Sequence, residues 1–199
     1  MTTEREQTAL PGGAVTKQTA IVPLAGLWIV GAVLAALVAV IAGNWYSPLN
    51  FFHVVAGSLW TGIDLFMGFV IGPILPRLDP PARIALTRRL MPKMLLIMPT
   101  LVLVTLTSGW QLGRLRGFLF LPYPHHWWLV ASIAIVGITA VMAYAILEPA
   151  NITVLLELRK PQPNGLLISR LMRRFIYIAG INGVMLVANF VVMARFATW

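Results

Sequence analysis

Five long apolar stretches account for most of the 199-residue sequence and limit what the chain can fold into. They lie at residues 21–43, 50–75, 93–112, 126–147 and 174–196. Each has about 20 residues or more, enough for an α-helix to cross about 30 Å of hydrocarbon at about 1.5 Å per residue. Charged residues make up only 11% of the chain, less than half of the roughly 25% typical of a soluble domain. We therefore predict an all-α polytopic membrane protein with five transmembrane helices.

The stretches divide the chain into a tail and one transmembrane domain. Residues 1–20 are polar and contain Pro11-Gly12-Gly13, which predicts a disordered tail. Residues 21–199 are expected to form a single domain, in which the last four stretches make a four-helix bundle. The first stretch is too long for a signal-peptide core of 7–15 residues. It is expected to be an additional helix that packs outside the bundle through its small residues, Gly31, Ala35 and Ala39.

The basic residues predict the orientation of the chain. Of the 15 Lys and Arg residues, all but Arg114, Arg116 and Arg195 lie in the tail or in the loops that five spans place on its side of the membrane. Positive charge marks the cytoplasmic side, so the N-terminus is expected in the cytoplasm and the C-terminus outside. We predict a protein of the bacterial cytoplasmic (inner) membrane that contacts lipid. Because the net charge of +9 is a topology signal, nucleic acid is not an expected partner.

Histidines are the strongest candidate ligands. The chain has no cysteine, which excludes thiolate zinc sites, cysteine-held iron–sulfur clusters and c-type haem. Its three histidines, His53, His125 and His126, are all expected near the outer face. Two imidazoles on facing helices would suffice for a b-type haem. Alternatively, His53 is a hydrogen-bonded structural residue, and the other two are interfacial residues.

The stretch at 50–75 places four notable residues on one helical face. His53, Gly57, Trp60 and Asp64 are spaced by 4, 3 and 4 residues, close to whole helical turns. Gly57 allows a flat cofactor or a neighbouring helix to come close. Asp64 falls near mid-membrane, where a lone carboxylate is costly, so it should be neutral, paired or part of a proton path. Its candidate partners on other helices are Asn182, Asn189, Thr105 and Ser108.

Two further groups have both a functional and a simpler interpretation. Arg114 and Arg116 are the basic residues of the predicted outer loop. They suit haem propionates, or they are solvated loop charges. Met91, Met94 and Met98 share one helical face. Thioethers bind Cu(I), although methionines at this spacing usually serve in packing.

Several segments resemble one superfamily of four-helix membrane proteins. His53-Val-Val-Ala-Gly-Ser-Leu-Trp60-Thr-Gly62 resembles the first core helix of HemJ-type protoporphyrinogen oxidases and of the CopD copper-resistance membrane domain. The next two core helices are similar at Arg88-Arg89-Leu-Met91-Pro-Lys-Met94, at Ser108-Gly109-Trp110 and at Trp127-Trp128-Leu-Val. The resemblance covers about residues 51–147.

The resemblance implies a b-type haem whose histidine ligand corresponds to His53, with electrons passed to a respiratory partner or quinone. The CopD-like members imply copper uptake instead. HemJ-type proteins have an essential lysine early in the third core helix. Residues 128–132 of this chain contain no lysine, which leaves protoporphyrinogen oxidation without its second residue. His126 or His125 is the nearest substitute as a second ligand.

We therefore expect a haem b-binding integral membrane redox protein with the haem in the outer half of the bundle. His53 is one expected axial ligand, and His126 or His125 is the other. The remaining expected site residues are Gly57 and Trp60 lining the haem, Arg114 and Arg116 at its propionates, and Asp64 as a proton-linked catalytic group. Alternatives are a cofactor-free accessory subunit of a larger complex and a copper-import protein. A protein partner is expected in each case, and whether the chain is itself an oxidoreductase is left open.

Overall fold

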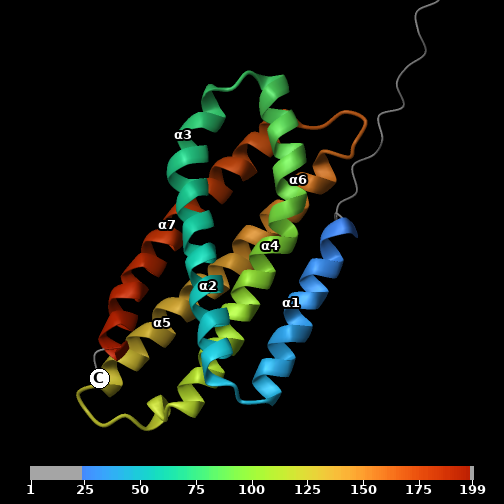
Figure 1. Ribbon diagram of the computed structural model, residues 1–199. Helices are drawn as coiled ribbons and strands as arrows, with labels where there is room; N and C mark the ends of the chain where they lie inside the picture. Colours follow the sequence, from blue (N-terminus) through green and yellow to red (C-terminus); the bar gives the residue numbers. More distant parts are fainter. Residues whose placement is uncertain (1–23, 198–199) are drawn as a thin grey trace, which may run out of the picture.

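The computed structural model describes residues 24–197, which form helical rods without any β-strand (Figure 1). The first rod is α1 (Leu24–Ala42). The second joins α2 (Tyr46–Leu65), the π-helical η1 (Phe66–Ile71), α3 (Gly72–Ile74) and the 3-10 turn η2 (Leu75–Arg77). The third is α4 (Pro80–Leu115), followed by the short 3-10 turn η3 (Phe118–Phe120). The fourth joins α5 (His126–Met142), the π-helical η4 (Ala143–Leu147) and α6 (Glu148–Glu157), and α7 (Gly165–Ala197) is the last.

Four of the rods are long and apolar enough to cross a membrane, as in an integral membrane protein. They cover Tyr46–Arg77, Pro80–Leu115, His126–Glu157 and Gly165–Arg195. The prediction of an all-helical membrane protein is confirmed to this extent. The apolar part of α1, Gly26–Ala42, is shorter, so the fifth span and the orientation of the chain stay predictions. The predicted tail and the start of the first stretch lie outside the described residues.

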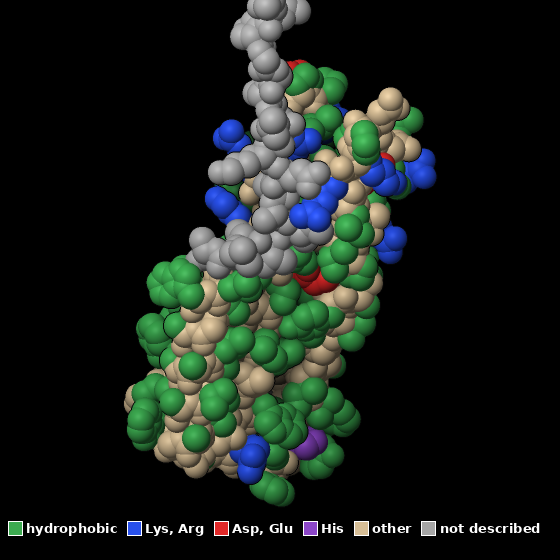
Figure 2. All heavy atoms as spheres, turned by 90° about the vertical axis from the view of Figure 1, so that its right-hand side faces the viewer, with side chains coloured by type: hydrophobic (Ala, Val, Ile, Leu, Met, Phe, Trp, Pro, Cys, Tyr) green, Lys and Arg blue, Asp and Glu red, His purple; other side chains and the backbone are tan. Residues whose placement is uncertain are grey.

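The long rods form a bundle with α1 at its edge (Figure 1). α2 packs between α4 and α7, α5 packs mainly against α7, and α1 lies against α4 and α2. The main hydrophobic core lies inside the bundle and includes Trp60, Met91 and Met172, each at most 2% exposed. Lys and Arg side chains gather toward one end of the face shown in Figure 2, and apolar side chains cover most of its length below them.

The predicted contact face of α1 was wrong. Gly31, Ala35 and Ala39 are exposed, and α1 instead buries Leu37 against Ala56 and Val104. Large apolar side chains on the opposite face bury more surface against the bundle than small ones. Closer contact through glycine occurs elsewhere, between Gly68 and α7.

Prolines explain how the rods depart from regular α-helix. Pro73 and Pro149 each follow a π-helical segment, η1 and η4 respectively. A proline lacks the N–H that would bond the carbonyl four residues earlier, and its ring crowds that carbonyl. Those carbonyls, of Phe69 and Ala145, lie within the two π-helical segments, where the wider turn relieves the conflict. α4 begins directly after Asp79, and it continues through two internal prolines without a break.

Candidate functional site

A buried polar centre lies where α2 packs against α7. Asp64 on α2 is 1% exposed and accepts a hydrogen bond of 2.7 Å at Oδ2 from Asn182 Nδ2 on α7. Trp60 is fully buried one turn earlier on α2. Its indole Nε1 lies beside the same carboxyl group but does not form a hydrogen bond with it. A buried polar group is tolerated when it is hydrogen-bonded. Of the four candidate partners named for Asp64, Asn182 is the one that bonds it.

Several polar atoms near this centre lack partners among the described residues. They are Trp60 Nε1, Asn182 Oδ1 and, two turns further along α7, Asn189 Oδ1. Each orphaned buried polar atom costs about 1–3 kcal/mol, so this group departs from ordinary packing. Trp60 and Asn182 are the two side chains beside the Asp64 carboxyl group, and Asn189 lies further along α7.

His53 lies about three turns before Asp64 on the same rod and faces α4. Its Nδ1 lies 3.0 Å from the backbone oxygen of Thr105. A carbonyl oxygen only accepts hydrogen bonds, so Nδ1 carries the proton and Nε2 keeps its lone pair. Histidine ligands of metals are commonly oriented in this way, with the second nitrogen bonded to a carbonyl or carboxylate. The side chain is half-buried.

Gly109 on α4 makes the room that the His53 ring occupies. A Cβ atom at this position would lie 2.6 Å from His53 Cε1 and 2.8 Å from its Nδ1. Sequence reasoning placed Gly109 in a motif but gave it no role, and it did not connect Thr105 with His53. Gly57 also faces α4, where an added Cβ would lie 3.5 Å from Thr105 Cγ2. Of the two partners considered for Gly57, the described structure places the neighbouring helix there.

The other histidines lie on a different helix pair. His125 and His126 are half-buried at the start of α5, and the His126 ring centroid is 5.4 Å from that of Tyr123. α5 packs mainly against α7, whereas His53 faces α4. No cluster of three or more His, Asp or Glu side chains suited to a metal ion occurs within the described range, although an axially ligated haem needs only one or two.

Arg114 and Arg116, of the predicted outer loop, are exposed near the end of α4. Arg116 donates a hydrogen bond to Tyr46 Oη, and its guanidinium lies 4.4 Å from the centroid of the Tyr46 ring. This contact joins the start of α2 to the end of α4. Arg116 therefore has a protein partner, and a propionate role for it and for Arg114 stays a prediction.

The three methionines of the predicted stripe lie in the main core. Met91, Met94 and Met98 are at most 8% exposed and pack with side chains of α6 and α7. Their burial fits the packing interpretation.

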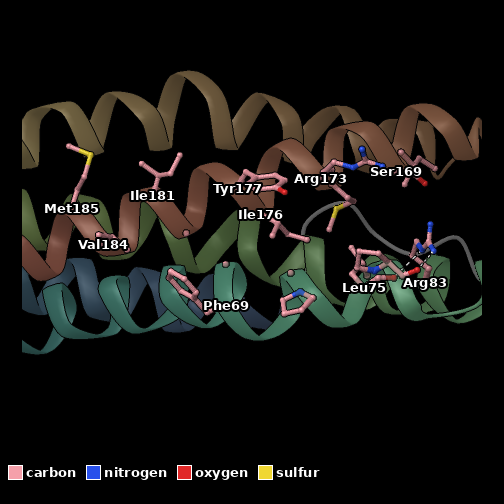
Figure 3. Close-up of a pocket in the computed structure, with 17 residues that line it drawn as sticks. Phe69, Leu75, Arg83, Ser169, Arg173, Ile176, Tyr177, Ile181, Val184 and Met185 are labelled. Atoms are coloured by element: carbon pink, nitrogen blue, oxygen red, sulfur yellow. Dashed lines mark hydrogen bonds between the residues drawn. The ribbon is translucent and has the colours of Figure 1, made fainter.

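Two cavities of different size lie in the described part of the bundle. The larger, of about 800 Å³, is an open groove between α3 and α7 (Figure 3). A much smaller one lies beside Met98, Glu148 and Asn151. No histidine lines either cavity. The hydrogen bonding of His53 thus fits a haem ligand, whereas the space for a porphyrin is not provided by either cavity.

The chain matches no family model, and no curated protein or solved structure is significantly similar to it. The fold and composition define a helical-bundle membrane protein.

Proposed function

We propose that the chain is an integral membrane protein that binds b-type haem through His53 and exchanges electrons with a protein partner or quinone. The observation that carries this proposal is the contact of His53 Nδ1 with the Thr105 carbonyl oxygen at 3.0 Å. It leaves Nε2 as the ligand atom and fixes the plane of the ring. A bound haem supplies one-electron chemistry that none of the side chains provides.

The protein residues have distinct parts in this proposal. His53 ligates the iron, the Thr105 carbonyl holds the imidazole in one tautomer, and Gly109 admits the ring between α2 and α4. The second ligand is proposed to be His126 or His125. Asp64, buried against Asn182, is proposed as the group that binds or releases a proton.

The visible spectrum tests this proposal directly. Full-length protein purified in detergent should show a sharp reduced α-band and a pyridine haemochrome of the b type. His53→Ala should lose that band while the protein stays folded, and substitution of His125 and His126 in turn should identify the second ligand. A featureless spectrum from protein expressed with ample haem would overturn the proposal.

Gly109→Ala tests whether the position of the ring matters. The added Cβ would lie 2.6 Å from His53 Cε1, so the imidazole must move and its bond to Thr105 must lengthen or break. We expect a shifted haem midpoint potential, measured by redox titration of the α-band, or a reduced haem content, measured by the pyridine haemochrome. Gly113→Ala, one turn later with nothing within 4 Å of the added Cβ, is the matched control. Identical titrations for the two variants would contradict the positioning role.

A cofactor-free accessory subunit is the second candidate, because no histidine lines either cavity. It predicts a featureless spectrum together with a stoichiometric partner that co-purifies from native membranes. The copper-import alternative predicts bound copper that is lost in Met94→Leu and Met98→Leu, which elemental analysis measures.

A further inference from the structure

The groove between α3 and α7 has an apolar length and a cationic end. Gly68, Gly72 and Gly180 lie along its floor, and apolar side chains, among them Phe69 and Ile181, form its walls. Figure 3 shows Ser169, Arg173 and Arg83 near one end, and Val184 and Met185 at the other. This is the distribution of polarity that a single amphiphilic molecule would match.

Glycines explain why a groove exists here. An added Cβ on Gly68 would lie 2.3 Å from the Cα of Gly180, and one on Gly72 would lie 2.8 Å from Ile176 Cγ2. The two rods therefore touch backbone to backbone at Gly68 and Gly180, and at Gly72 the backbone of one rod meets the Ile176 side chain of the other. Because the glycines carry no side chains, the larger side chains beside them, such as Phe69 and Ile181, form the sides of the groove.

The two arginines at the polar end form no salt bridge among the described residues. The Arg83 guanidinium donates from Nε to the carbonyl oxygen of Leu75 and from Nη2 to those of Pro76 and Leu78. These bonds hold it in place and use no N–H of Nη1. Arg173 is exposed. Both guanidinium groups are therefore available to an anion.

The length of the groove is comparable to one leaflet of a bilayer. Its lining on α7 extends from Ile168 to Met185, a step of 17 residues that rises about 26 Å. Half of a bilayer with its headgroup region is about 20–22 Å. The cationic end lies among the basic residues that the sequence places at the cytoplasmic surface, where anionic lipids are attracted.

We infer that this groove binds one anionic phospholipid, with its phosphate at Arg173, Arg83 and Ser169 and an acyl chain along the glycine floor. Charge complementarity and the leaflet-length apolar groove support this occupant over a zwitterionic lipid. The inference does not depend on haem binding.

Native mass spectrometry of the full-length protein in detergent tests the site. The protein is titrated with phosphatidylglycerol and, in parallel, with phosphatidylcholine of the same acyl chains. We expect one preferentially retained phosphatidylglycerol per chain, weakened about fivefold in Arg173→Ala. Arg174→Ala is the matched control, because Arg174 is an exposed neighbour that does not line the groove. Arg83 is left intact, since its guanidinium also binds the carbonyls around η2.

A second pair of variants tests the acyl-chain half of the site. Val184→Trp should fill the groove and reduce retention of phosphatidylglycerol, whereas Val191→Trp, at an exposed position on α7 outside the groove, should not. Equal retention of the two lipids by the wild type, or equal losses in Arg173→Ala and Arg174→Ala, would overturn the inference. So would a quinone that displaces the lipid and binds Arg173→Ala as well as wild type.

Discussion

Gly68→Ala should destabilise the protein by about 3 kcal/mol, because the added methyl group has no space. Its Cβ would lie 2.3 Å from the Cα and 2.9 Å from the N of Gly180. Both neighbours are backbone atoms of a helix, which cannot rotate away as a flexible side chain can. The two rods must separate, and overpacking of this kind costs typically 1–3 kcal/mol and sometimes more. Thermal or SDS-induced unfolding in detergent, followed by circular dichroism, measures the loss.

Gly62→Ala is the matched control for this prediction. Gly62 is an exposed helical glycine on the same rod, and an added Cβ would have nothing within 4 Å. Alanine is favoured over glycine in a helix interior by up to about 1 kcal/mol, so this variant should be as stable as the wild type or slightly more stable. If Gly68→Ala unfolds at the same point as Gly62→Ala, the close contact of the rods at Gly68 is wrong.

Asn182→Ala should destabilise the protein by about 2 kcal/mol through the loss of one hydrogen bond. The Asn182 amide donates a hydrogen bond of 2.7 Å to the Asp64 carboxyl group, and both residues are at most 1% exposed. Truncation leaves the carboxyl group buried without this donor, which costs about 1–3 kcal/mol. The same unfolding assay measures the effect.

Asn189→Ala separates this effect from the removal of any buried amide. Asn189 lies on the same helix and is 6% exposed, and its Oδ1 has no partner among the described residues. Its truncation should therefore be clearly milder. Asp64→Asn should be tolerated, because an amide oxygen can accept the same bond and carries no charge to bury. Equal destabilisation by the two asparagine variants would contradict a specific role for the Asp64–Asn182 bond.

The sequence predicted the long helices well, because hydrocarbon thickness imposes a length that apolar composition reveals. It located the ends of the helices less well. The apolar stretch at 174–196 predicts a shorter helix than α7, which begins at Gly165, because its first turns carry charged residues that hydropathy excludes. The contact face of α1 was misassigned, because small residues on a helix surface indicate a possible close contact without naming a partner.

The candidate site was predictable only where a buried polar side chain requires a hydrogen-bond partner from another side chain. A buried carboxyl group needs a donor, and few polar side chains occur on the other helices, so Asn182 could be named in advance as one of four candidates. The partner of His53 is a backbone carbonyl, which every residue carries, so the sequence does not single out Thr105. The groove beside α7 depends on how two rods cross, which no local pattern specifies.

The π-helical segment η1 also changes the angular phase of its rod. An α-helix turns by about 100° per residue, and each π turn adds about one residue to the turn. A helical wheel that starts at His53 is therefore out of register by roughly 100° beyond Ile71. Before this offset the rod contacts both α4 and α7, and beyond it the rod contacts mainly α7. A single uninterrupted helix of the same sequence would turn the Gly72 side of the rod away from α7, and the groove would lose one of its walls.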